Sequence, residues 1–249
     1  MRNIMMTLAY DGTFYHGFQK QKGTALKTVQ QELETALGIL SAEEVTVYGS
    51  GRTDAGVHAE GQVINFHTTS RIPVERFPLA VNSLLPRDIV VSEARDVTED
   101  FHARYSAKRK TYRYTIYNAP YLSPFWRHYA YHVPVSLDAG RMETAAASFL
   151  GAHDFRGFCA KDTAVTDFTR TIYSCSVEKH GPLLIISVEG DGFLYNMVRI
   201  MAGTLLEIGQ NKREIDNIAF LLKKGDRKQA GMTLPPQGLC LYSVGYPDL

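Results

Sequence analysis

Hydrophobic and polar positions alternate over four short segments in the first hundred residues. Such alternation, bounded by turn residues, is typical of strands packed on one face. The predicted strands span residues 3–9, 45–48, 62–67 and 88–93. Between them, apolar residues recur at helical intervals in two segments, one beginning after Thr28 and one running from Phe77 to Leu85. Because the Thr28 hydroxyl can accept from the amide of Gln31, it is expected to cap the first helix.

This order, β-α-β-β-α-β, is the ferredoxin-like pattern, in which both helices cover one face of an antiparallel sheet. The other face is expected to be free. The second half repeats the idea less regularly. Its predicted strands span residues 111–118, 170–177, 183–189 and 239–244, and its predicted helices span 137–150, 193–208 and 215–222.

We therefore expect an α+β protein made of two ferredoxin-like (RRM-like) halves, residues 1–103 and 104–249. Their antiparallel sheets would flank a central catalytic cleft, with the helices on the outer faces. Such an arrangement leaves a broad concave surface, which suits an extended or bulky ligand better than a small metabolite.

Composition narrows the class of protein. Hydrophobic residues make up 45% of the chain, which excludes a disordered protein, and no apolar run approaches the roughly 18 residues of a membrane span. The three cysteines are odd in number and lack C-x-x-C spacing, so neither a disulfide framework nor a cysteine zinc site is indicated. The first residues turn polar too soon for a signal peptide. A cytoplasmic protein without a membrane partner is the expectation.

The net charge of +1, from 27 basic and 26 acidic residues, argues by itself against a nucleic-acid partner. The distribution of charge points the other way. Residues 104–113 hold five basic residues and no acid, with Tyr105 and Tyr112 interleaved, whereas residues 93–100 hold four acids. A basic cluster with aromatic residues is typical of an RNA contact. A solvated strand edge, kept basic to block aggregation, is the alternative, and the sequence leaves both open.

The turn at residues 51–56, GRTDAG, is the most unusual local feature. Glycines bracket Arg52 and Asp54, and His58 follows closely. Glycine lets a backbone approach a ligand, and functional loops often lie between strands. Asp-Ala-Gly is also ordinary turn chemistry, so a purely structural turn remains open. The chain has no phosphate-loop or dinucleotide motif, and His128 and His132 lack a carboxylate that would complete a metal site.

Two further residues have double interpretations. Tyr112 lies in an alternating strand, so its ring is either half-buried core or a surface on which a nucleobase could stack. Arg199 projects from a predicted helix face that also carries Ala202, Gly203 and Leu206. An arginine among small and apolar groups usually has a specific carboxylate partner, because unpaired burial is costly.

Five segments in the same order resemble motifs of the TruA family of tRNA pseudouridine synthases. The segments are residues 10–19 (YDGTFYHGFQ), 51–58 (GRTDAGVH), 101–104 with 110–114 (FHAR and KTYRY), 193–199 (FLYNMVR) and 236–242 (PQGLCLY). The resemblance covers nearly the whole chain. Asp191 and Cys240 depart from the residues that are frequent in the family, and neither is a proposed catalytic group.

The resemblance implies an enzyme that isomerises uridine to pseudouridine at positions 38–40 of the tRNA anticodon stem-loop. It implies a homodimer and no cofactor. Asp54 would be the nucleophile and Arg199 its cationic partner; whether Asp54 attacks C1′ or removes the C2′ proton stays open. Tyr112 would stack on the target base, and Arg52 would fill the space that the uridine leaves. The expected RNA contacts are Phe18, Gln19, Lys20, His58, Lys108, Arg109 and Lys110.

The rival hypothesis is a non-catalytic RNA-binding protein with RRM-like sheets. Such a protein needs stacking surfaces and cations, but it has no use for a carboxylate facing phosphates. A glycoside-type hydrolase would need a second carboxylate opposite Asp54, and no candidate stands out.

Overall fold

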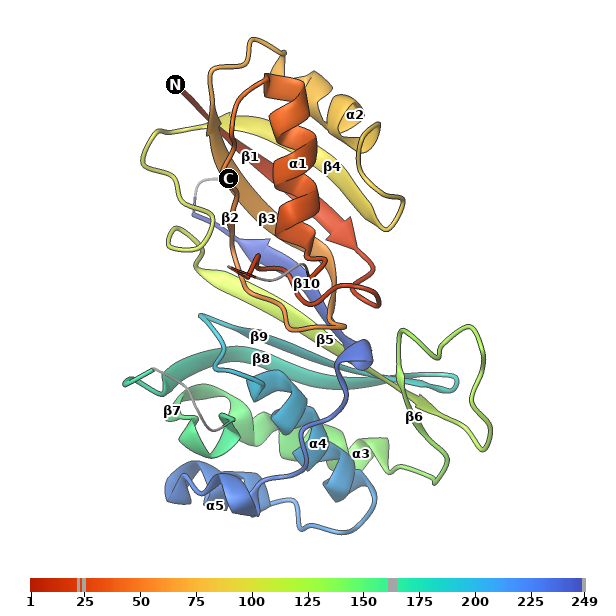
Figure 1. Cartoon of the computed structure of the whole chain (residues 1–249). Coiled ribbons are helices and arrows are strands. Elements are labelled where there is room, and N and C mark those ends of the chain that lie inside the picture. Colours follow the sequence, from red (N-terminus) through yellow and green to blue (C-terminus); the bar gives the residue numbers. More distant parts are fainter. Residues whose placement is uncertain (22, 24–25, 161–164, 248–249) are drawn as a thin grey trace. The chain divides into compact units, whose positions relative to one another are not determined.

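The computed structural model describes residues 1–21, 23, 26–160 and 165–247, and the chain divides into two compact units (Figure 1). Unit 1 comprises Met1–Lys108 with Cys240–Leu249, and unit 2 comprises Arg109–Leu239. Residues 104–108 and 240–247 thus pack with the N-terminal segment, whereas the sequence places them in the second half. The cause is pairing: the Lys108 amide donates to the Gly245 carbonyl at 2.9 Å.

Unit 1 has the β-α-β-β-α-β order that its hydrophobic pattern predicts. Its elements are β1 (Arg2–Tyr10), α1 (Val29–Ser41), β2 (Tyr48–Gly49), β3 (His58–Thr68), α2 (Phe77–Asn82) and β4 (Ile89–Val97). The strands pair in the order β4-β1-β3, all antiparallel, and both β2 and β10 (Leu239–Gly245) pair with β3. Figure 1 shows α1 and α2 over the same face of this sheet. The side chain of Thr28 caps α1 as expected.

The second predicted strand is shorter than expected. Only Tyr48 and Gly49 pair with β3, opposite Asn65 and Ile64. Val45 and Val47 are nevertheless buried. Their alternation therefore reflects packing against the core rather than a strand ladder.

The sheet face of unit 1 opposite the helices is not free, which corrects the expectation. Met5 and Val63 form a small core with the fully buried Ala103, and Phe101 and Tyr246 pack against it. Buried asparagines hold the covering segment in place. Asn3 Nδ2 donates to the Phe101 carbonyl at 2.9 Å, and Asn65 Oδ1 accepts from the Ala103 amide at 2.9 Å.

Unit 2 contains five strands and three helices among its described residues. The elements are β5 (Arg109–Asn118), β6 (Tyr131–Val133), α3 (Ala139–Ala146), β7 (Gly151–Asp154), β8 (Thr169–His180), β9 (Leu183–Gly190), α4 (Met197–Gly209) and α5 (Asn217–Lys224). The sheet order is β5-β9-β8-β7, with β6 parallel to β5. Figure 1 shows the three helices on the same side of this sheet. The predicted β8–β9 hairpin is confirmed, and Gly181 in its turn has φ +60.

Two helices of unit 2 differ in extent from their predictions. The helix expected from residue 193 begins at Met197, because Asn196 has a left-handed φ of 60° and cannot continue a helix. The helix expected over 137–150 ends at Ala146, and a 3-10 turn, Ala147–Phe149, continues its apolar pattern.

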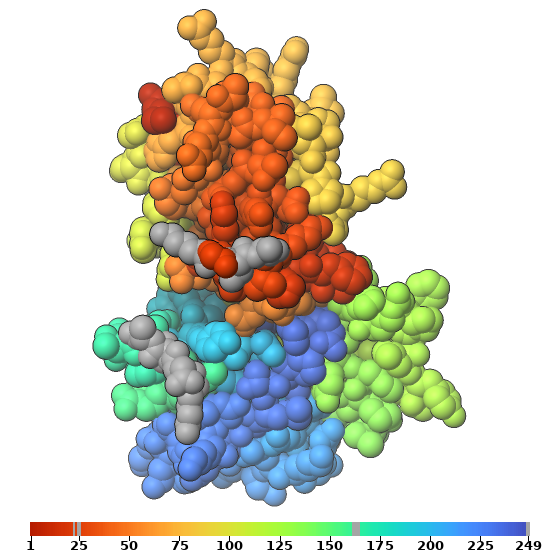
Figure 2. Space-filling model, viewed as in Figure 1, coloured from red at the N-terminus to blue at the C-terminus, as the bar shows by residue number. Residues whose placement is uncertain are grey.

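A segment of unit 2 between β5 and β6 carries aromatic residues outside the core. Figure 2 shows this segment, in yellow-green, projecting from the unit. Tyr121 and Phe125 are 86% and 84% exposed there. Among the described residues, no helix combines the length and the apolar character needed to cross a membrane.

Candidate active site

The turn at residues 51–56 is clamped by the N-terminal segment that follows β1. The Phe18 amide donates to the Thr53 carbonyl at 3.1 Å, and the Gly56 amide donates to the Tyr15 carbonyl at 3.3 Å. Within the turn, the Val57 amide donates to the Asp54 carbonyl at 3.1 Å. The two unusual sequence motifs, residues 10–19 and 51–58, therefore form one structure. We call residues 50–57 the Asp54 loop.

Two glycines of the N-terminal segment are required by this close approach. Gly17 has φ +88, and a Cβ there would lie 2.7 Å from the Thr53 carbonyl oxygen. A Cβ at Gly12 would overlap the Val57 carbonyl oxygen. Any side chain at either position would push the Asp54 loop away.

A buried network of polar side chains supports the Asp54 loop from the protein interior. The Tyr10 and Thr53 hydroxyls are 2.7 Å apart. Gln62 Nε2 donates to the Gly51 carbonyl at 2.9 Å, and Ser50 Oγ donates to Gln62 Oε1 at 2.6 Å. Burial raises the pKa of Tyr10, so its phenol stays protonated. Because buried polar groups have fixed partners, this network holds the loop in one conformation.

The candidate nucleophile and its neighbour differ in exposure. Asp54 is half-buried, between the buried Thr53 and the exposed Ala55, and Arg52 is exposed. The loop thus presents a carboxylate and a guanidinium two residues apart on a rigid backbone.

His58 lies at the end of the Asp54 loop and is only 7% exposed. Its Nδ1 accepts from the Gly12 amide at 3.1 Å and lies 3.2 Å from Asp11 Oδ1. These contacts connect the C-terminal end of the Asp54 loop to the turn at Asp11 and Gly12 that follows β1. The predicted contact of His58 with RNA stays a prediction, and the burial leaves little side-chain surface for it.

The other predicted RNA contacts of unit 1 differ in exposure and surroundings. Phe18 is 3% exposed, whereas Gln19 and Lys20 are exposed. Lys20 Nζ is 3.4 Å from a carboxylate oxygen of Glu34. Phe18, Gln19 and Arg52 line a groove of about 350 Å³. Lys108, the last residue of the Met1–Lys108 segment of unit 1, is exposed.

Arg199 lies in the first turn of α4, where two of its nitrogens have partners. Nε donates to the Leu234 carbonyl at 2.6 Å, and Nη1 donates to Asn196 Oδ1 at 2.8 Å. The small residues that share its helix face have a structural role. A Cβ at Gly203 would overlap the Met232 carbonyl oxygen, so glycine there lets residues 231–234 lie against α4.

Tyr112 lies on β5 and is 9% exposed. Its ring meets Phe193 edge-on, with the ring centroids 5.2 Å apart and an interplanar angle of 84°. The neighbouring basic residues differ in their surroundings. Arg109 Nη1 donates to Glu189 Oε1 at 2.8 Å, and its guanidinium lies 4.5 Å from the Tyr173 ring centroid, whereas Lys110 is half-buried.

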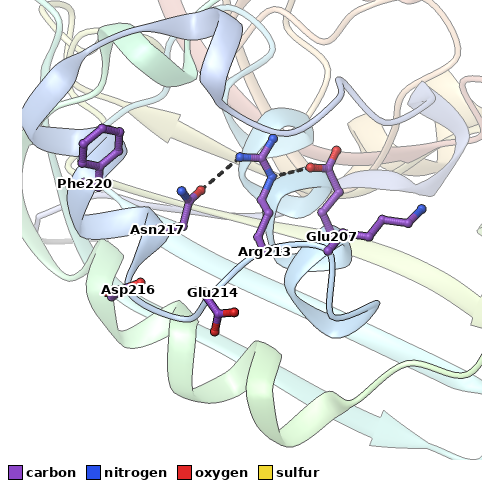
Figure 3. Close-up of a pocket in the computed structure, with 7 residues that line it drawn as sticks. Glu207, Arg213, Glu214, Asp216, Asn217 and Phe220 are labelled. Atoms are coloured by element: carbon purple, nitrogen blue, oxygen red, sulfur yellow. Dashed lines mark hydrogen bonds and ion pairs between the residues drawn. The ribbon is translucent and has the colours of Figure 1, made fainter.

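A second hollow, of about 690 Å³, lies in unit 2 between the end of α4 and α5. Figure 3 shows Arg213 directed at Glu207 and Asn217 there. Glu214 is in turn 3.6 Å from Arg141. Because its charges neutralise one another, this hollow is a structural charge cluster. Among the described residues, no group of three or more His, Cys, Asp or Glu side chains could hold a metal ion.

The structure thus places the predicted site residues in two sets. Arg52 and Asp54 share one loop of unit 1, and Tyr112 and Arg199 lie on β5 and α4 of unit 2. Sequence reasoning missed the polar network of Tyr10, Ser50 and Gln62 beneath the loop. Tyr10 and Gln62 alternate with apolar neighbours as ordinary strand residues do, so their spacing carries no signal.

Comparison with known proteins identifies the family. A model of the tRNA pseudouridine synthase family matches residues 6–106 and 145–247. The chain belongs to this family.

The relatives are similar over their whole length. The chain is 51% identical over 243 residues to the tRNA pseudouridine synthase A of Moorella thermoacetica, covering 98% of this chain and 99% of that protein. It is 48% identical over 249 residues to that of Anoxybacillus flavithermus, covering 100% of both. Among solved structures, a chain in the crystal structure of a Cbf5-Nop10-Gar1 complex is 15% identical, with a TM-score of 0.37, over 94% of this chain and 50% of that one.

Proposed function

We propose that this protein is a tRNA pseudouridine synthase that converts uridine to pseudouridine at positions 38–40 of the anticodon stem-loop. Family membership over residues 6–106 and 145–247 and the full-length relatives support this activity. The main structural observation in support of the activity is the hydrogen-bonded Asp54 loop, which carries the Asp54 carboxylate two residues from an exposed Arg52.

The reaction is an isomerisation that leaves the elemental composition of the substrate unchanged. The N1–C1′ bond of uridine breaks, the uracil rotates, and a C5–C1′ bond forms. The proton on C5 leaves, and N1 takes up a proton. Neither an oxidant nor a group donor is needed, so we propose that the enzyme works without a cofactor.

Asp54 acts in this proposal as the nucleophile at C1′. An ionised carboxylate is required, and a nearby cation favours ionisation. Arg199 supplies that cation, held at the start of α4 by Asn196 and Leu234. The rigid support of the Asp54 loop fixes the direction of attack, because preorganised groups lose little entropy during reaction.

Tyr112 and Arg52 act on the target base and on its place in the stem. Tyr112 stacks on the flipped uracil, and its edge-on contact with Phe193 fixes the plane of the ring. A uridine must leave the helix before a carboxylate can reach C1′, at a cost of a few kcal/mol. Arg52, which is exposed and two residues from Asp54, enters the space left behind.

Recognition depends on RNA shape and phosphate contacts more than on base reading. Lys20, Lys108 and Lys110 supply cations for this, and Gln19 a polar contact. Such recognition suits a substrate set with several target positions. We further propose that the two units are ferredoxin-like halves, and that the enzyme is a cytoplasmic homodimer.

The proposal is tested by the change Asp54→Asn, which keeps the size of the side chain and removes its nucleophilic charge. We expect tritium release from C5-labelled uridine in tRNA to fall by at least about 10³-fold, with RNA affinity and the unfolding midpoint largely retained. Asp100→Asn, a change at an exposed acid of the same unit, is the matched control and should release tritium normally. Turnover retained in Asp54→Asn would sink the assignment.

The two chemical routes differ in the bond that Asp54 breaks first. If Asp54 attacks C1′, tRNA deuterated at C2′ of the target uridine should react at the normal rate in single turnover. A large primary isotope effect with that substrate would instead make Asp54 the base that removes the C2′ proton.

A further inference from the structure

A groove of about 350 Å³ in unit 1 combines exposed aromatic rings with cations beside the Asp54 loop. Its walls include Tyr48, His102 and Tyr105, together with Arg52 and Arg104. Tyr105 is 75% exposed and Tyr48 is 41% exposed. Ligand sites range from roughly 300 to 1,000 Å³, so this volume suits a single nucleotide.

The three rings form a continuous series. The His102 ring centroid lies 5.1 Å from that of Tyr48 and 4.5 Å from that of Tyr105. The guanidinium carbon of Arg104 is 5.9 Å from the Tyr105 ring centroid. Partial burial, aided by the Arg104 cation, lowers the pKa of His102, so its ring is neutral at pH 7.

Hydrogen bonds fix the wall of the groove before any ligand arrives. Asn65 accepts from the Ala103 amide at 2.9 Å, and Tyr246 donates to the Ala103 carbonyl at 2.7 Å. Strand register places Tyr48 directly opposite Asn65, which brings the Tyr48 and His102 rings together. The Arg104 amide donates to His102 Nδ1 at 3.1 Å, which leaves Nε2 as the protonated nitrogen in the neutral ring.

We propose that this groove is a nucleotide subsite that holds one unpaired base of the RNA, a neighbour of the reacting uridine, stacked on Tyr105 and the adjacent rings. Arg104 neutralises its phosphate. The subsite rests on the proposed RNA substrate and adds a second anchored nucleotide beside the uridine that meets Asp54. Stacking on aromatic rings tolerates any base, because every base has a π-face. This agrees with an enzyme that modifies several positions in different sequence contexts.

The main test removes the ring and keeps an apolar side chain. Base–aromatic stacking is worth roughly 1–3 kcal/mol per base, so Tyr105→Leu should raise the Kd for tRNA by about 5- to 150-fold. Tyr105→Phe, which keeps the ring, should restore the affinity. Tyr121→Leu removes a tyrosine of unit 2 that is 86% exposed and should bind tRNA normally. A normal Kd for Tyr105→Leu would overturn the subsite.

A second test pairs the protein change with an RNA change. Anticodon stem-loops carrying one abasic nucleotide, placed in turn at each position flanking the target, should include one that wild-type protein binds about 5- to 150-fold more weakly. The Tyr105→Leu variant has already lost the stacking ring, so the same abasic position should raise its Kd by less than about twofold relative to the intact stem-loop. If, at every position, the protein change and the abasic nucleotide together weakened binding by the sum of their separate free energies, the subsite would be contradicted.

Salt dependence isolates the cation of the groove. Arg104→Gln should reduce the slope of log Kd against log salt by about 1, because one fewer phosphate is neutralised. An unchanged slope would remove Arg104 from the subsite. Failure of the wider function looks different: wild-type protein would then form no pseudouridine, whatever its affinity. Pseudouridine formation with a normal Kd for Tyr105→Leu would overturn the subsite alone.

Discussion

At the scale of single residues, the protein depends on positions where a side chain is forbidden as much as on those that carry chemistry. Gly17 and Gly12 allow the N-terminal segment to touch the Asp54 loop, and a Cβ at either would meet its backbone. The backbone that carries Asp54 is thus positioned by residues that have no side chain of their own. The sequence marks this loop as unusual, because glycines bracket Arg52 and Asp54. Its proposed role comes from the family resemblance, since the spacing alone also fits an ordinary structural turn.

Gly17→Ala tests this positioning. The change combines a positive φ with a contact of 2.7 Å to the Thr53 carbonyl, and should destabilise the fold by about 2–4 kcal/mol and lower kcat. Gly23→Ala is the matched control, since Gly23 has φ +77 and a Cβ there would meet nothing within 4 Å, and it should cost only about 1–2 kcal/mol. Urea unfolding and tritium release measure both. Equal losses for the two variants would mean that the contact with Thr53 is unimportant.

The cysteines give a second prediction at this scale. Burial raises the pKa of the Cys175 thiol to about 12, and the side chain is 9% exposed. Because the thiolate is the reactive form, little of it exists at pH 8. Cys175 should therefore resist iodoacetamide in the folded protein and react readily in urea, as measured by peptide mass mapping. Labelling of the folded protein at the rate of a model thiol would contradict the buried environment.

At the scale of elements, the hydrophobic periodicity of the sequence predicts the long strands and the helices. It fails for strands that pair over only a few residues. β6 and β7 span three and four residues, too few for an alternation to be recognised. β2 is shorter than its apolar pattern, because Val45 and Val47 pack into the core without pairing. The unusually apolar face of Arg199 is visible in the sequence. That residues 231–234 cover this face depends on contacts far apart in the chain, which spacing cannot reveal.

Gly203→Ala tests how α4 is held. Its Cβ would overlap the Met232 carbonyl, so residues 231–234 must move, and with them the Leu234 carbonyl that accepts from Arg199. We expect a loss of about 1–3 kcal/mol in unfolding free energy and a lower kcat. Gly140→Ala in α3 meets only an ordinary contact of 3.4 Å and should stabilise by about 0.5–1 kcal/mol. A neutral Gly203→Ala would refute the close packing.

At the scale of the whole molecule, the near-zero net charge says little about the partner. The chain carries +1 overall, yet residues 104–113 concentrate five cations next to the four acids of residues 93–100. The structure refines this picture. Arg109 is already engaged by Glu189, whereas Arg104 and Lys108 are exposed. The local balance of basic and acidic side chains, rather than the net charge of the chain, determines where RNA can bind.

Salt titration measures the number of cations that act. With few phosphates neutralised, log Kd for tRNA should rise with log salt with a slope of about 2–5. Fluorescence anisotropy at several ionic strengths would provide the slope. An affinity independent of salt would exclude the phosphate contacts on which the proposed recognition depends.

The most direct measurement is pseudouridine mapping, by carbodiimide adducts and reverse transcription, in unmodified tRNA incubated with the protein. Wild-type protein should introduce pseudouridine at positions 38–40, and Asp54→Asn should introduce none while still binding the tRNA. Pseudouridine formed by Asp54→Asn, or none formed by the wild-type protein, would contradict the account.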